Sequence, residues 1–115
     1  HLDWTEKAAR SGRHPIKVVY PTSLALKKAG FADAFRTIHP DEMDNPGYTW
    51  TPIMKADDPT THHDRIDFIY FKGKGVTVVD VKIVGENKKN AGIVISPYPS
   101  DHRAVVAAFT YNSAK

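Results

Sequence analysis

The chain has 115 residues, of which 41% are hydrophobic and 25% charged, and this composition is typical of one modest globular domain rather than a disordered tail. It contains no cysteine, which excludes disulfide bonds and thiolate metal sites, and no apolar stretch approaches membrane-spanning length. The net charge of +3 suits an anionic partner, but no basic tract is dense enough to indicate nucleic-acid binding by itself. Composition leaves the cellular compartment open.

The first third of the chain predicts two short helices around extended segments. Residues 3–10 are expected to form a helix that ends before Gly12, and residues 16–20 an extended segment closed by proline. Residues 24–29 predict an amphipathic helix that is capped by the preceding Thr-Ser pair and ends at a glycine. Residues 31–38 are expected to be extended, with Ala32, Ala34 and Arg36 on one side and Asp33, Phe35 and Thr37 on the other.

The rest of the chain predicts strands. The stretch 39–64 is rich in proline and aspartate, so it is expected to be mostly loop, with a strand around residues 48–50. The sequence Lys-Gly-Lys-Gly at residues 72–75 predicts a hairpin turn between two strands. Strands are expected over residues 65–71, 76–84, 93–95 and 104–109.

The predicted strands over residues 66–71 and 104–109 carry apolar side chains on both faces. A sheet that is apolar on both faces has to be covered on both, and two short helices cover one side at most. We therefore expect a missing segment, a partner chain or a second copy to cover the other face.

Two short motifs carry the candidate chemistry. Ser100-Asp101-His102 lies directly before the last apolar run, and Arg65-Ile66-Asp67 lies on a predicted strand about 35 residues upstream. An aspartate that bonds one ring nitrogen of a histidine fixes the tautomer and favours the charged form of the ring. If Asp67 and His102 lie side by side in the fold, the two can accept and return a proton.

Each motif also has a simpler interpretation. A Ser-Asp pair before a strand is an ordinary turn, and Asp67 in an apolar strand can form a structural ion pair with Arg65 or Arg103. The His62-His63-Asp64 run looks like a metal cluster, but adjacent histidines on a strand point to opposite faces. That run is expected to be a loop feature near the substrate at most.

Four motifs in order, at residues 33–36, 48–50, 65–69 and 100–102, resemble the C-terminal half of the endonuclease/exonuclease/phosphatase superfamily, which has the deoxyribonuclease-I-like fold. The resemblance implies an α+β fold with a mostly antiparallel sheet and flanking helices, about half of a four-layer αββα sandwich. It makes residues 1–115 a single partial domain, with a missing N-terminal half or a second copy on the open sheet face.

The resemblance also implies an activity, the hydrolysis of phosphodiesters or phosphomonoesters with Mg²⁺ or Mn²⁺. His102 would act on the attacking water or the phosphate, Asp67 would orient it, and Asp101 would bind the metal. The substrate-binding positions implied are Arg36, Trp50 and Arg65.

The chain departs from the family pattern where the N-terminal metal ligands should lie, because the family's glutamate, its Asn-x-His-type strand and its Asp-x-Asn motif are missing. The chain is therefore expected to be the C-terminal portion of a phosphoesterase and inactive alone. The substrate, a small phosphorylated molecule or a nucleic acid, stays open. The alternative is a non-catalytic binding or self-associating module that keeps the scaffold.

Overall fold

The computed structural model describes residues 2–53 and 62–113 of the chain. Short helices and small sheets are mixed along it, which confirms the predicted α+β class. In chain order the elements are α1 (Glu6–Arg10), α2 (Pro21–Lys28), β1 (Ala32–Asp33), α3 (Ala34–Ile38), β2 (Tyr70–Phe71), β3 (Val76–Gly85), β4 (Ile93–Val94) and β5 (Ala104–Tyr111).

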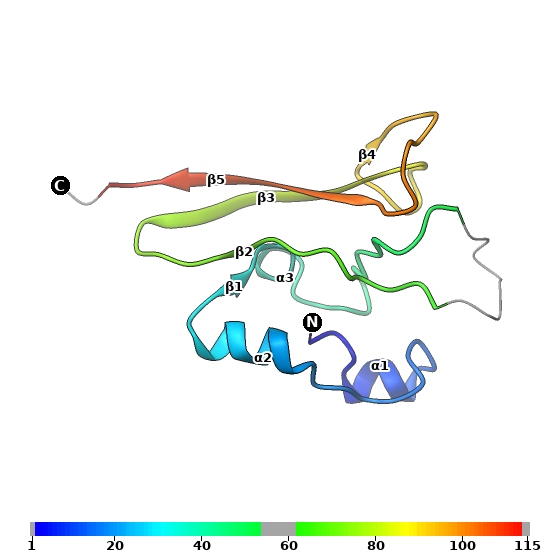
Figure 1. Ribbon diagram of the computed structural model, residues 1–115, viewed down its shortest axis with the longest axis horizontal. Helices are drawn as coiled ribbons and strands as arrows, with labels where there is room; N and C mark the ends of the chain where they lie inside the picture. Colours follow the sequence, from blue (N-terminus) through cyan, green and yellow to red (C-terminus); the bar gives the residue numbers. More distant parts are fainter. Residues whose placement is uncertain (1, 54–61, 114–115) are drawn as a thin grey trace.

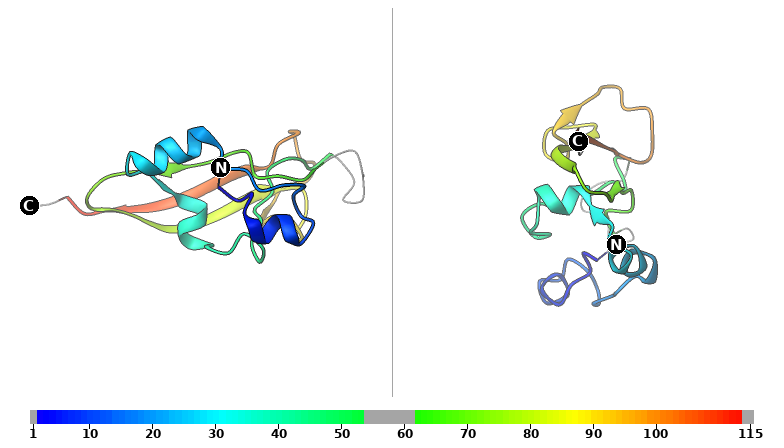
Figure 2. Two further views of the ribbon diagram at one scale, coloured as in Figure 1. Left: turned by 90° about the horizontal axis from the view of Figure 1, so that it is seen from below. Right: turned by 90° about the vertical axis from the view of Figure 1, so that its left-hand side faces the viewer.

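The described elements stack in layers from top to bottom of Figure 1, across the longest axis of an elongated molecule (Figures 1 and 2). One layer is a sheet of order β4-β3-β5, in which β3 pairs antiparallel with β5 and parallel with β4. The middle layer holds α3 and the small antiparallel pair β1-β2. Helices α1 and α2 lie on the far side of that middle layer, away from the larger sheet.

The hydrophobic core lies between α3 and the β4-β3-β5 sheet. Phe35 of α3 packs with Val78, Val81 and Ile83 of β3, and all four are at most 6% exposed. After a bulge between Val78 and Asp80, the side chains of β3 alternate between buried and exposed, as expected for a strand with one covered face.

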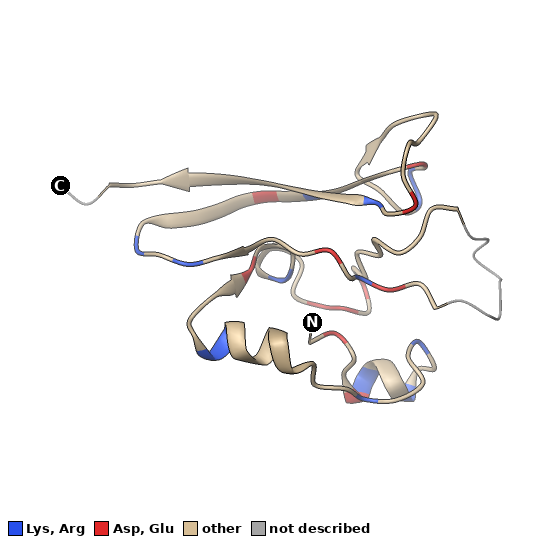
Figure 3. Ribbon diagram, viewed as in Figure 1, with Lys and Arg blue, Asp and Glu red and all other residues tan. Residues whose placement is uncertain are grey.

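The opposite face of this sheet is not covered by any described helix (Figures 1 and 2). Val79 and Val106 are 51% and 44% exposed. Strand β5 carries no charged residue, as its uniform colour in Figure 3 shows. Within the described residues, no helix has the length and apolar character needed to cross a membrane.

The prediction that residues 31–38 are extended is wrong. Only Ala32–Asp33 is strand, and Ala34–Ile38 forms α3. The carboxylate of Asp33 accepts the backbone N–H groups of Phe35 and Arg36 at 3.0 and 3.3 Å, which caps the first turn of a helix. The prediction missed this capping aspartate, which decides the conformation of so short a segment.

The predicted hairpin across residues 72–75 is also not formed. Residues 65–69 lie outside any strand, and β2 pairs with β1 and not with β3, so the turn connects two different sheets. Gly75 instead accepts a hydrogen bond from Asn112 N at 2.8 Å, just beyond β5. Its φ of +83° and the closeness of the Asn112 carbonyl leave no room for a side chain there.

The helix boundaries differ from the prediction in smaller ways. The hydroxyl of Thr5 caps α1, which begins at Glu6 and not at residue 3. Helix α2 begins at Pro21, which occupies the first helical position, so Thr22 and Ser23 lie inside the helix and do not cap it. Residues 16–20 join no sheet, whereas the predicted strands at 93–95 and 104–109 correspond to β4 and β5.

Candidate active site

Asp67 and His102, which are separated by 35 residues in the sequence, meet in the structure. His102 Nδ1 lies 2.9 Å from Asp67 Oδ2, and each side chain is 38% exposed. An ionised carboxylate only accepts hydrogen bonds, so Nδ1 carries the proton and donates it. In the neutral ring, Nε2 therefore keeps a free lone pair, and it has no hydrogen-bond partner among the described residues.

The backbone around Thr49 brings these two residues together. The Thr49 hydroxyl accepts the N–H groups of Ile66 and Asp67 at 3.0 and 3.1 Å, and its carbonyl accepts Arg103 N at 2.7 Å. Trp50 forms isolated bridges with Asp64 on one side and His102 on the other. The segment predicted as a strand at 48–50 is thus a short connector between the two motifs.

Thr49 is fully buried, so its hydroxyl is held in place for this contact. Because that hydroxyl occupies the N–H groups of residues 66 and 67, this part of the predicted strand has no ladder of backbone hydrogen bonds to form. Sequence reasoning did not single out Thr49, although it stands in the quoted Tyr48-Thr49-Trp50 motif. The sequence shows Thr49 only as a threonine within a polar loop, and its burial becomes visible in the structure.

Trp50 lies against the imidazole of His102. Their ring centroids are 5.0 Å apart with an interplanar angle of 69°, an edge-to-face contact. A hollow of about 560 Å³ opens beside the pair, and it is lined by Asp67, His102, Ile95 and Tyr98 among others. Trp50, which was predicted to bind substrate, thus lies next to the predicted Asp67–His102 pair. The hollow beside the pair has space for a ligand.

The electrostatic surroundings favour the protonated imidazole. The hydrogen bond that His102 donates to Asp67 raises the pKa of His102, the slight burial lowers it, and the negative charges of Asp67 and Asp101 raise it further. The net result is a His102 pKa above its ordinary value. A histidine of this kind can switch between acid and base close to neutral pH.

Asp101 is exposed next to His102, and its backbone carbonyl accepts a hydrogen bond from the buried hydroxyl of Thr51. In the described ranges 2–53 and 62–113, no three acidic or histidine side chains converge in a way that could hold a metal ion. Asp101 therefore offers one oxygen ligand, and these residues do not complete a ligand set for Mg²⁺ or Mn²⁺.

Arg65 lies in the interior and not on a surface that substrate reaches. It is 2% exposed, and its guanidinium forms ion pairs with Asp3 and Asp33, each at 2.7 Å. Burial acts to raise the pKa of Asp3, but hydrogen bonds from Arg36 and Arg65 outweigh it and lower that pKa to about 2. The substrate-binding role predicted for Arg65 finds no support in this position.

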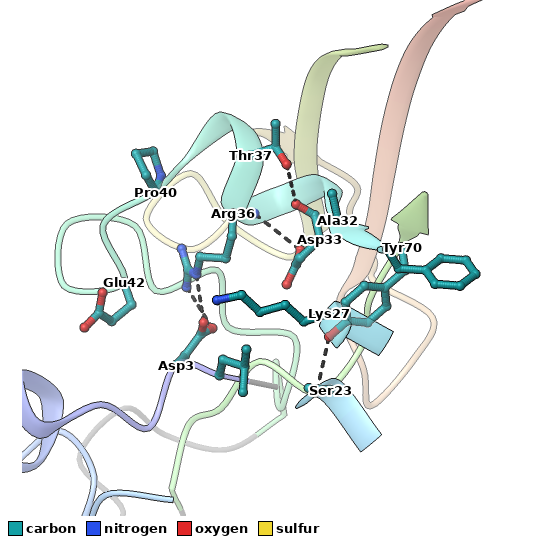
Figure 4. Close-up of a pocket in the computed structure, with 12 residues that line it drawn as sticks. Asp3, Ser23, Lys27, Ala32, Asp33, Arg36, Thr37, Pro40, Glu42 and Tyr70 are labelled. Carbon is teal, nitrogen blue, oxygen red and sulfur yellow. Dashed lines mark hydrogen bonds and ion pairs between the residues drawn. The ribbon is translucent and has the colours of Figure 1, made fainter. Parts of the chain in front are cut away.

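Arg36 is similarly committed to the fold. Its five N–H groups make five hydrogen bonds, two of them to the carboxylate of Asp3, at 2.9 Å each, and three to the backbone carbonyls of His39, Asn45 and Pro46. Figure 4 shows Arg36 and Asp3 facing each other in the wall of a hollow of about 410 Å³. No donor of Arg36 is left for a phosphate unless one of these bonds breaks.

The simpler interpretation of Asp67, an ion pair with Arg65 or Arg103, is not what the structure contains. Arg65 pairs with Asp3 and Asp33, while Arg103 pairs with Glu86 at 2.6 Å. The hydrogen bond from Arg103, opposed by burial, lowers the pKa of Glu86 to about 2. Both neighbouring arginines are therefore neutralised elsewhere, and Asp67 is left to His102.

Comparison with known proteins adds one similarity. No family model matches the chain, and no solved structure matches it. The chain is 34% identical over 119 residues to the "Uncharacterized protein F14F9.5" of Caenorhabditis elegans, in an alignment that covers 96% of this chain. The chain spans 37% of the length of that relative, whose name states no activity.

Proposed function

We propose that the chain is the C-terminal portion of a divalent-metal-dependent phosphoesterase in which His102 handles the proton. The observation that carries this proposal is the 2.9 Å hydrogen bond between His102 Nδ1 and Asp67 Oδ2, at the edge of a hollow large enough for a ligand. The resemblance of the two motifs to the endonuclease/exonuclease/phosphatase superfamily supports the same conclusion.

The proposed chemistry follows from the two ring nitrogens of His102, of which Nδ1 bonds Asp67 and Nε2 is open to a ligand. His102 Nε2 takes a proton from water as the water oxygen bonds to phosphorus, and Asp67 stabilises the imidazolium that forms. The bond from phosphorus to the leaving oxygen breaks on the opposite side. The leaving alkoxide takes a proton from solvent water, and the imidazolium releases its proton to solvent, so the ring ends neutral.

The proposal includes a metal ion for which the described residues of this chain supply only some of the ligands. A bound Mg²⁺ or Mn²⁺ would offset negative charge on the phosphoryl oxygens. Asp101 is the described carboxylate next to His102, and the other ligands would come from outside the described residues. We therefore expect little or no turnover by the 115-residue chain alone.

Hydrolysis of bis(p-nitrophenyl) phosphate and of p-nitrophenyl phosphate with Mg²⁺ or Mn²⁺ tests the proposal, in the full-length protein and in this chain. His102→Ala in the full-length protein is expected to lower kcat about a hundredfold or more, the usual contribution of a general acid–base group. Asp67→Asn should also lower kcat, whereas the exposed Asp44→Asn serves as the matched control.

Three results would contradict the proposal. Rapid metal-dependent turnover by the 115-residue chain alone would show that no essential ligand is missing. A full-length protein without activity on either ester, or one that keeps full activity after His102→Ala, would remove the assigned role. The relative rates on the two esters also separate a phosphodiesterase from a phosphomonoesterase, which the residues at the pair do not decide.

A non-catalytic, self-associating module is the second candidate, and the open sheet face favours it. Val79 of β3 and Val106 of the uncharged strand β5 are both more than 40% exposed. Two copies could cover each other's sheet, as could another segment of a longer protein. Light scattering decides between these, because a monomer at high concentration excludes the second copy as the covering element.

A further inference from the structure

A second hollow, of about 550 Å³, lies on the other side of Arg103 from the hollow at His102. It is lined by side chains from segments that are far apart in the sequence, and these include Arg13, Tyr48, His62, His63, Lys89 and Arg103. We refer to it as the basic hollow. Arg103 is the one residue that the two linings share, so the basic hollow does not include the Asp67–His102 pair.

The carboxylate of Glu86 in this lining is already neutralised. Its two oxygens accept hydrogen bonds from Arg103 at 2.6 and 2.8 Å, and Oε1 also accepts the side-chain amides of Asn87 and Asn90. Arg103 is 2% exposed and uses its charge in this ion pair. Glu86 is therefore not available to balance any other cation in the hollow.

Among the residues that the structure describes, two cations of this lining have no counter-ion. Arg13 donates from Nη1 to the backbone carbonyls of Glu42 and Met43 at 2.9 and 2.8 Å, which fixes its side chain but leaves its charge uncompensated. The ammonium of Lys89 has no hydrogen bond or ion pair with any of the described residues, and its side chain is exposed. As far as the structure describes its lining, the basic hollow thus has an excess of positive charge.

Other donors surround the same space. The ring of His63 lies 5.8 Å from the ring of Tyr48, between centroids, and His62 is exposed beside it. A guanidinium, an ammonium and imidazole N–H groups that converge from different segments match the oxygens of a tetrahedral anion, which accepts hydrogen bonds in several directions. We propose that the basic hollow binds a phosphate group, separately from the Asp67–His102 pair.

An NMR titration of this chain with inorganic phosphate, at constant ionic strength, tests the proposal. We expect saturable shifts of the His62 and His63 imidazole signals. Lys89→Gln should weaken the apparent affinity about tenfold, because it removes one charge-assisted hydrogen bond. Lys88→Gln is the matched control, since Lys88 is an equally exposed neighbour that does not line the hollow. Phenyl phosphate in a parallel titration distinguishes a free phosphate site from a site for a phosphate ester.

Which histidine signals shift distinguishes phosphate binding in the basic hollow from phosphate binding at the Asp67–His102 pair. Shifts confined to His102 would place phosphate at the catalytic pair and overturn the basic hollow as a separate site. Equal weakening by Lys89→Gln and Lys88→Gln would show unspecific attraction to a basic surface and would also overturn it. Loss of catalysis after His102→Ala, with phosphate binding at His62 and His63 unchanged, would uphold both.

Discussion

Asp3→Asn removes the carboxylate that holds two arginines, and we expect it to lower the free energy of unfolding substantially. Asp3 is 7% exposed and accepts hydrogen bonds from Arg36 and Arg65 between 2.7 and 3.1 Å. Breaking a buried ion pair by removal of one partner costs about 3 kcal/mol or more, since a buried charge is left uncompensated. Arg65 keeps Asp33 as a partner, which moderates the loss.

The lowered pKa of Asp3 gives a second value for the free energy that its pairing with Arg36 and Arg65 contributes to folding. Its lowering from 3.8 to about 2 corresponds to about 2 kcal/mol, at about 1.4 kcal/mol per pKa unit. Because the folded-state pKa is depressed, this stability is present above pH 4 and is lost as the pH falls towards 2. The wild-type chain should lose it across that window, and the Asp3→Asn variant should not.

Urea unfolding followed by circular dichroism, repeated from pH 7 to pH 2, measures both effects. Asp80→Asn is the control, because Asp80 forms an exposed ion pair with Lys82 at 2.7 Å and contributes little. If Asp3→Asn is no more destabilising than Asp80→Asn at pH 7, or shows the full acid-dependent loss of the wild type, the pairing of Asp3 with Arg36 and Arg65 does not support the fold; Glu86, whose pKa is also lowered, accounts for a part of the loss that both proteins share.

Three further outcomes are expected. Gly47→Ala should lower the free energy of unfolding by about 1–3 kcal/mol, because the φ of Gly47 is +65° and a Cβ there would collide with the Phe35 ring. Gly12→Ala, at a similar φ but in open space, should be less destabilising when both variants are compared by thermal unfolding. Glu86→Gln should destabilise the chain to urea near neutral pH by leaving a buried arginine unpaired. Thr49→Val should lower the His102 pKa measured by NMR and Thr49→Ser should restore it, since the hydroxyl positions the partner of His102; an unchanged pKa in the valine variant would exclude that role.

The sequence predicted the features that depend on continuous apolar patterning. The alternating strand at 76–84 and the apolar run at 104–109 correspond to β3 and β5 and pair with each other. The Asp67–His102 contact was predicted from two separated motifs through a family resemblance, and the two residues lie within hydrogen-bond distance. Whether they act in catalysis stays a prediction.

The features that the sequence did not predict depend on single polar contacts between distant segments. The cap at Asp33 turned an apparent strand into α3, and the Thr49 hydroxyl holds residues 66–67 outside any ladder. Arg36 and Arg65 looked like surface groups for a phosphate, but Asp3, from the start of the chain, pairs with both. No local pattern indicates a partner that lies 33 or 62 residues away.

The most direct test of the central claim is the NMR titration of the His102 imidazole in the wild-type chain and in Asp67→Asn. The account predicts a wild-type pKa above 6.5 that falls on substitution, together with loss of the Nδ1–H signature of a carboxylate-bonded ring. An ordinary His102 pKa in the wild type, or one that Asp67→Asn does not change, would contradict the pairing from which the proposed function follows.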